Sequence, residues 1–340
     1  MEKSDKFIGV FSLVLSIIGM VCGLYTFYGV WIETSDFNFF TGSKIFHLLF
    51  AFSTLNLDFS NKFDHLEIWS FIFYTLLFVG SLQFLKTKGR ETRLLGFVFS
   101  VIFLNAIIIF LQSTIFKLFF VKWGNYTAFQ IFNSIYSSII LVGMVIVSFR
   151  ISKIIKSKKE IDIIETQYRK SITDTSRWQR FFHWIIDSTI MALIFIPIII
   201  FLSHGFIDSD MYRESESLQM FFRGKAALYV ITFVVLFIYY PISEILFGAS
   251  PAKFLTESRV VNSKAESPNF SSIFLRTLCR NIPFDALSFF SQRGWHDSLS
   301  ETYVVKEKTT GFKTNKLLWI LPFLIIYLLI MYFGKEYFTR

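Results

Sequence analysis

Four polar or aromatic residues form a regular series within an apolar segment near the middle of the chain. Arg180, His183, Trp184 and Asp187 are spaced i, i+3, i+4 and i+7, so they share one face if the segment is a helix. Asp187 would then lie about 10 Å along the helix from Arg180. If that helix spans a membrane, a carboxylate at this depth must face protein or water. Two roles are open for Asp187: it coordinates a proton or cation, or it forms a structural ion pair.

A second acidic residue, Glu244, lies four residues before Gly248, at the end of another apolar segment. If the two segments form antiparallel helices, Glu244 lies at a depth similar to that of Asp187. The two carboxylates and His183 would then converge in a cluster suited to cation or proton exchange, because close like charges shift a pKa toward neutrality. In the alternative interpretation, Glu244 accepts hydrogen bonds from backbone N–H groups of the SPAK turn at 250–253 and anchors that loop.

Catalytic signals are weak. His296, Asp297 and Ser298 are the residue types of a hydrolase triad, but residues adjacent in the chain rarely have triad geometry. The sequence has no nucleophile elbow, no paired metal ligands, no phosphate-binding loop and no dinucleotide-binding glycine motif. We therefore predict that the chain is not an enzyme and uses no metal or cofactor.

The composition indicates that lipid surrounds most of the chain. Hydrophobic residues make up 53% of the 340 positions, with 45 phenylalanines and a mean hydropathy of +0.52. Stretches long enough to cross a bilayer as helices recur, and they lack the alternation of barrel strands. The sequence thus predicts an all-α polytopic membrane protein with about seven transmembrane helices, at 7–32, 66–85, 94–116, 126–149, 181–203, 226–248 and 317–334.

The distribution of basic residues predicts the orientation. Segments 1–6, 86–93, 150–180 and 250–316 contain 25 of the 34 lysines and arginines, and the segments between them and after the last span contain 9. Because cytoplasmic loops carry the excess of positive charge, we expect a plasma (inner) membrane protein with a cytoplasmic N-terminus and an external C-terminus. The net charge of +9 then reflects topology and attraction to anionic lipid headgroups, and nucleic acid is not expected as a partner.

The charge pattern divides the chain into regions. Residues 1–149 form a four-helix membrane region of no recognised family. Residues 150–175 form a basic cytoplasmic linker, where isoleucines at helical spacing indicate either an amphipathic surface helix or a solvated helix. The outer loop 33–65 contains the short apolar stretch KIFHLLFAF, which suits an interfacial segment.

Four motifs in order resemble the RDD family of membrane domains over about 176–306, followed by a C-terminal linker and last helix at 307–340. They read SRWQRFFHWIIDS, YYPISEILFGASPAKFLTESRVV, FLRTLCRNIPFDALSFF and RGWHDSLSETYVV. By position, the one arginine and two aspartates that give the family its name are Arg180, Asp187 and Asp297. The family's acidic residue and its G-x-S/T-P-G-K turn correspond to Glu244, Gly248, Ser250, Pro251 and Lys253. Ala252 and Glu257 stand where the family commonly has glycine.

The last two motifs predict a small cytoplasmic structure below the spans. The segment RTLCRNIPFDALSFF is too short and too polar to cross, so we expect a re-entrant or interfacial helix. Trp295, next to His296, is expected as an interfacial anchor. The β-branched runs at 259–261 and 303–305 are expected to pair as a β element. We predict that Asp297 pairs with an arginine of this face, Arg180, Arg276 or Arg280.

Two functions follow as expectations. Some members of the RDD family are associated with sodium/proton antiport, which implies transport of protons or monovalent cations through a cluster around Asp187 and Glu244. RDD domains also occur as accessory parts of larger membrane proteins. The alternative is therefore a non-catalytic scaffold or assembly factor that binds another membrane protein or a second copy of the chain.

Overall fold

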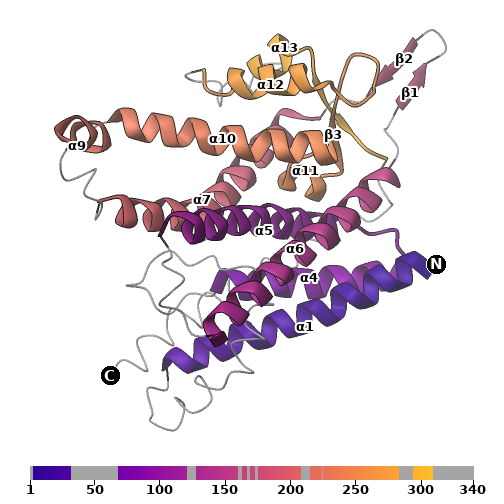
Figure 1. Cartoon of the computed structure of the whole chain (residues 1–340). Coiled ribbons are helices and arrows are strands. Elements are labelled where there is room, and N and C mark those ends of the chain that lie inside the picture. Colours follow the sequence, from indigo (N-terminus) through magenta and orange to yellow (C-terminus); the bar gives the residue numbers. More distant parts are fainter. Residues whose placement is uncertain are drawn as a thin grey trace, which may run out of the picture. The chain divides into compact units, whose positions relative to one another are not determined.

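The computed structural model describes most of the chain, in segments that include the site (Figure 1). The described residues are 3–31, 68–120, 128–159, 163–166, 169–172, 175–207, 215–223, 225–282 and 294–308. Three sequence predictions lie outside these residues: the outer loop 33–65, the second part of the non-crossing segment at 283–293, and the last span 317–334.

Four apolar helices form the N-terminal region: α1 (Lys3–Trp31), α4 (Ile68–Lys86), α5 (Arg93–Phe120) and α6 (Ala128–Ser157). Helix α1 packs along α4, and α5 packs along α6. Every residue of α5 from Leu94 to Ala106 is buried, because α4, α6 and a short later helix surround it. A helix that is apolar all round, as α5 is, belongs in such a central position.

Four of the described helices are long and apolar enough to cross a membrane, at Lys3–Val21, Arg93–Thr114, Ser134–Ser157 and Tyr229–Phe247. They coincide with the first, third, fourth and sixth predicted spans. The predicted spans 66–85 and 181–203 coincide with α4 and with a 31-residue helix, α7 (Arg177–Ile207). The chain is thus a mostly helical membrane protein.

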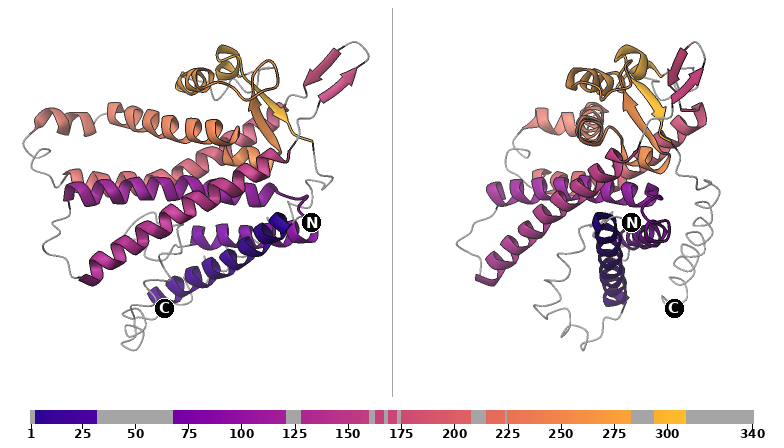
Figure 2. Two further views of the ribbon diagram at one scale, coloured as in Figure 1. Left: turned by 45° about the vertical axis from the view of Figure 1, so that its right-hand side comes forward. Right: turned by 90° about the vertical axis from the view of Figure 1, so that its right-hand side faces the viewer.

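The basic linker differs from its prediction. Instead of a helix over the whole of 150–170, α6 ends at Ser157, and two strands follow, β1 (Ile163–Thr166) and β2 (Arg169–Ile172). They pair antiparallel, with Ile163 opposite Ile172 (Figure 2). The isoleucines that suggested an amphipathic helix are β-branched, and β-branched residues also favour strands. The helical spacing was therefore correct for Ile151, Ile154 and Ile155, which lie in α6, and wrong for Ile164, which lies in β1.

The C-terminal half places short elements at one end of two long helices. Besides α7 it contains α9 (Glu216–Arg223), α10 (Lys225–Phe247), α11 (Pro251–Leu255), β3 (Ser258–Val261), α12 (Phe270–Cys279), α13 (Trp295–Leu299) and β4 (Tyr303–Lys306). Helix α11 contacts α7, α12 contacts α10, and α13 contacts α12, whereas α9 lies at the other end of α10 (Figures 1 and 2).

The predicted pairing of 259–261 with 303–305 is confirmed. Strands β3 and β4 are antiparallel, with Arg259 opposite Val305 and Val261 opposite Tyr303. The turn before them begins at Gly248, whose φ of +68° is the left-handed conformation that glycine adopts without strain. Pro251 then occupies the first position of α11, where its missing N–H costs no helical hydrogen bond.

Contacts join the two halves of the chain through α11 and β3. The ring of Phe254 lies against Gly96 of α5, where a Cβ atom would stand only 2.4 Å from the ring carbon Cδ1. The Lys156 ammonium at the end of α6 donates to the carbonyl of Ser258 and to Glu307, both at 2.8 Å. These side chains are buried, so residues of the first half complete the packing of the second.

Glu257, one of the two departures from the family pattern, has a φ of +49°. This left-handed conformation explains why glycine suits the position before β3. The glutamate compensates in part through a buried ion pair, because its carboxylate lies 2.6 Å from the ammonium of Lys159.

Candidate functional site

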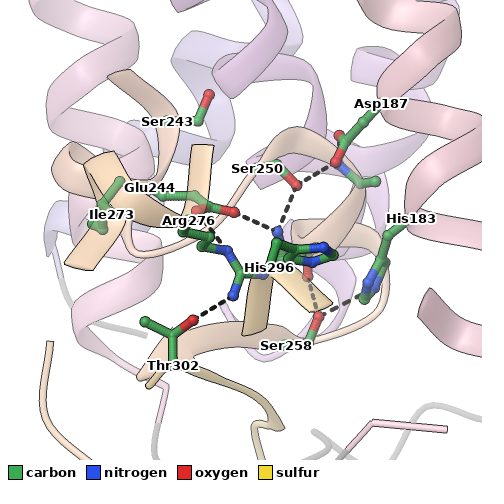
Figure 3. Close-up of polar contacts among 12 residues, drawn as sticks. His183, Asp187, Ser243, Glu244, Ser250, Ser258, Ile273, Arg276, His296 and Thr302 are labelled. Carbon is green, nitrogen blue, oxygen red and sulfur yellow. Dashed lines mark hydrogen bonds and ion pairs between the residues drawn. The ribbon is translucent and has the colours of Figure 1, made fainter. Parts of the chain in front are cut away.

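Asp187 is buried on α7, with 1% of its surface exposed, and its carboxylate accepts three hydrogen bonds. The donors are the hydroxyl of Tyr239 on α10 at 2.8 Å, the backbone N–H of Ala252 at 3.1 Å, and the hydroxyl of Ser250 at 2.6 Å, the last of which Figure 3 shows. The N–H of Ala252 lies in the first turn of α11, where helical N–H groups lack partners within the helix. Asp187 therefore faces protein, as expected, and it contacts α10 and fixes the turn that leads into α11.

Glu244 lies near the end of α10 within a group of three cationic side chains. Its carboxylate is 2.8 Å from the Lys253 ammonium, 3.1 Å from Nε of Arg276 and 3.0 Å from a terminal nitrogen of Arg280. Lys253 comes from the turn that Asp187 fixes, and the arginines come from α12 and its C-terminal end. Sequence analysis expected Glu244 either to accept hydrogen bonds from backbone N–H groups of this turn or to converge with Asp187 and His183. In the structure, three cationic side chains surround its carboxylate instead.

Asp297 closes the small structure formed by α12, α13 and β4. It forms an ion pair with a terminal nitrogen of Arg276, and the same nitrogen donates to the hydroxyl of Thr302 at 2.6 Å (Figure 3). Arg276 was one of the three predicted arginine partners, so that prediction is confirmed. Burial alone would raise the pKa of Asp297, but the charges of Arg276, His296 and Arg180 lower it from 3.8 to about 2.

The two histidines occupy different places. Nε2 of His183 lies 2.5 Å from the hydroxyl of Thr256 and 3.3 Å from that of Ser258, at the start of β3. Its hydrogen bonds within the described part of the chain thus fix the connection between α11 and β3. Nε2 of His296 lies 3.6 Å from the carboxylate of Asp297. This proximity follows from their neighbouring positions in the chain.

Arg180, the first residue of the family's name, is half-buried on α7 and donates from Nε to the hydroxyl of Thr175 at 3.3 Å. Ser250 connects the acidic centres, because it donates to Asp187 and lies 3.3 Å from the Lys253 ammonium. Trp295, the expected interfacial anchor, is 45% exposed at the start of α13.

A cavity of about 290 Å³ brings these residues together. All three residues of the family's name line it. Its full lining is Arg180, His183, Trp184, Asp187, Ser188, Met191, Thr232, Leu236, Tyr240, Lys253, Arg276, Arg280, Gly294, His296, Asp297 and Val304. Figure 3 shows Asp187, His183, Arg276 and His296 from several elements arranged around this region.

Positive charge predominates at the cavity wall. The wall contains two carboxylates, those of Asp187 and Asp297. It contains four arginine or lysine side chains: Arg180, Lys253, Arg276 and Arg280. Burial lowers the pKa of Lys253 although Glu244 opposes that shift, and the Arg280 guanidinium lies over the ring of Tyr240, 3.4 Å from its centre. Among the described residues, no three His, Cys, Asp or Glu side chains form a group able to hold a metal ion.

Sequence analysis missed several members of this site. Tyr239 and Ala252 were not identified as partners of Asp187, and Arg276 and Arg280 were considered only as partners of Asp297. One signal was available, since the two arginines are four residues apart and so share a helical face. That face meets Glu244.

Comparisons with known proteins agree with the motifs. No curated protein and no solved structure matches the chain. The model of the RDD family matches residues 175–337, a range that contains every residue of the cavity and continues beyond the motifs recognised in the sequence. Residues 175–337 thus form a domain of the RDD family.

Proposed function

We propose that this protein is a non-enzymatic membrane protein whose RDD cavity binds an anionic group. The observation that carries the proposal is the composition of the cavity wall, where four cationic side chains accompany two carboxylates. With Glu244, which lies behind the wall, three carboxylates face four cations, and the additional cation is the half-buried Arg180. An anion bound in the cavity would balance this charge and accept hydrogen bonds from the guanidinium groups.

The hydrogen-bond inventory supports an anion more than a cation. The carboxylate of Asp187 already accepts three hydrogen bonds, and that of Glu244 already faces three cations, so neither offers a free oxygen shell to a sodium ion. Nε of Arg280 and Oε2 of Glu244 are both buried without a hydrogen-bond partner among the described residues, but Oε2 of Glu244 has Nε of Arg276 within 3.1 Å. A donor without a partner, beside a cavity, suits an incoming acceptor.

Thermal unfolding of the purified protein in detergent tests this proposal, because a ligand that binds the folded state raises Tm. We expect sodium phosphate or sulfate at constant ionic strength to raise Tm relative to sodium chloride. Arg180→Gln, which removes a cavity charge from a half-buried position, should weaken this effect by about tenfold. Arg177→Gln is the matched control, since it makes the same change one turn earlier on α7 at an exposed position. Equal anion effects in both variants would contradict the proposal.

Cation or proton exchange is the second candidate, because Asp187 lies on a long apolar helix and lines the cavity. Sodium-dependent proton flux in proteoliposomes that is abolished by Asp187→Asn would favour it. A scaffold role would instead make the ion cluster purely structural. In that case neither anions nor cations should change the stability of the protein specifically.

For the topology we propose seven spans in the plasma membrane, with the N-terminus and the segment 250–316 in the cytoplasm, on the strength of the basic-residue distribution. The cavity would then open near the cytoplasmic headgroups. A cysteine introduced as Lys264→Cys should resist a membrane-impermeant thiol reagent applied to intact cells. Efficient labelling from outside would reverse the proposed orientation.

A further inference from the structure

The cavity wall changes from charged to apolar along two helices. On α7 the lining proceeds from Asp187 to Met191, and on α10 it proceeds from Tyr240 through Leu236 to Thr232. Each step of four residues advances about one helical turn away from α11, so the lining on α10 extends over about 12 Å. The cationic group therefore occupies one end of an elongated cavity whose other end is largely uncharged.

The uncharged end reaches the surface between two membrane helices. Thr232 is exposed and Leu236 is half-buried on α10, within the candidate span Tyr229–Phe247. On α7, Met191 lines this end and is 9% exposed, whereas the exposed Trp184 lies nearer the charged end. The neighbouring surface is apolar, because Tyr229, Val230 and Phe233 are exposed beside Thr232. In a bilayer, such an opening faces lipid chains.

Helix α12, which covers the cationic end, has an inverted arrangement of side chains. Its buried face carries Arg276, which is 1% exposed, while Phe270, Phe274, Leu275 and Leu278 are between 37% and 66% exposed. A short helix with an apolar outer face is suited to the boundary between headgroups and acyl chains. Phe274 also stacks edge-on against Phe237 of α10, which joins this surface to the span. If α12 lies at that boundary in a bilayer, the cationic end lies near the depth of the lipid phosphates.

From this gradient, opening and depth we infer that the cavity binds an anionic phospholipid. Its phosphate would meet the cationic side chains, Lys253, Arg276 and Arg280 among them, and an acyl chain would leave between α7 and α10 past Leu236 and Thr232. The inference rests on the proposed anion-binding function and specifies the ligand as an amphiphile. A free phosphate would use only the charged end.

The test compares three probes on the full-length protein in dodecyl maltoside: phosphatidylglycerol, phosphatidylcholine and inorganic phosphate. Retained lipid is measured by native mass spectrometry, and stability by thermal unfolding. Thr232→Trp blocks the uncharged end of the cavity with an indole ring and leaves the cationic side chains unchanged. Val234→Trp is the matched control, because Val234 is 46% exposed two residues away and does not line the cavity.

We expect phosphatidylglycerol to be retained and to raise Tm more than phosphatidylcholine does. Thr232→Trp should weaken phosphatidylglycerol binding at least tenfold and leave the response to inorganic phosphate unchanged, whereas Val234→Trp should change neither. If phosphate stabilises the protein but phosphatidylglycerol does not, or if both tryptophan variants retain the lipid equally, the lipid inference is wrong and the anion site stands. If neither phosphatidylglycerol nor phosphate stabilises the protein, both proposals fail.

Discussion

Replacing Asp297 with asparagine removes one charge from a buried ion pair and leaves the volume of the side chain nearly unchanged. The side chains of Arg276 and Asp297 are 1% and 2% exposed, so solvent does not screen their interaction. The pKa of Asp297 is lowered by nearly two units, from 3.8 to about 2, and at 1.36 kcal/mol per unit this corresponds to about 2 kcal/mol of stability. Breaking a buried pair by removing one partner typically costs about 3–5 kcal/mol. Because Arg276 keeps Glu244 and Thr302, we expect a loss of about 2–3 kcal/mol for Asp297→Asn.

The measurement is thermal unfolding in detergent, followed by tryptophan fluorescence, where a loss of this size should lower Tm by roughly 5 °C. Asp5→Asn is the matched control. Asp5 pairs with Lys158, whose side chain is 39% exposed, and such pairs are worth about 1 kcal/mol or less. In a double-mutant cycle, Arg276→Gln and Asp297→Asn together should cost clearly less than the sum of the two single changes. Additive losses, or an Asp297→Asn variant as stable as Asp5→Asn, would refute this account of the pair.

Three further changes test other parts of the structure. Gly96→Ala should destabilise the protein by about 1–3 kcal/mol, because the new methyl group meets the ring of Phe254. Gly143→Ala places its methyl group in open space and should stabilise the protein by up to about 1 kcal/mol. Equal denaturation midpoints of the two variants would contradict this packing. The folded-state pKa of Asp297 lies below its ordinary value, so the stability that its charge contributes is complete above about pH 4 and is lost as the pH falls toward 2. Tm should therefore fall between about pH 4 and pH 2, and it should fall less steeply in Asp297→Asn. Glu257→Gly relieves the strain of a left-handed backbone conformation but removes a buried ion pair. We expect thermal unfolding to show a net loss of stability of about 1–2 kcal/mol, and a gain in stability would show that the backbone strain is the larger effect.

The sequence was sufficient for features that depend on one segment or on one obligatory pairing. The apolar runs that contain α1, α5, α6 and α10 are long enough to identify the spans without knowledge of their neighbours. The β-branched runs before Val261 and after Tyr303 could pair only with each other in that region, and they do. Asp297 was expected to find an arginine because a buried carboxylate requires a counter-charge, and Arg276 provides it.

Features that depend on the three-dimensional arrangement could not be predicted. Glu244 draws partners from a turn nine residues away and from α12, more than thirty residues away, and no spacing rule links such positions. The charges that line the cavity come from several separate elements in the same way, so sequence analysis considered a cation site, whereas we propose an anion. In the linker, Ile155 and Ile164 have the same β-branched side chain, but the first lies in α6 and the second in β1, so neither spacing nor residue type was sufficient.

Helix α11 shows that a family boundary and a folding boundary need not coincide. The family match begins at residue 175, whereas the compact unit begins at Met1 and ends at Lys308. Lys253 contributes to the cavity, and the next residue, Phe254, fills the space above Gly96 of α5. An RDD segment excised at residue 175 would expose that ring to solvent. A chimaera with foreign N-terminal helices would need a comparable gap beneath the ring, so positions 96 and 254 should have changed together during the divergence of proteins that share this arrangement.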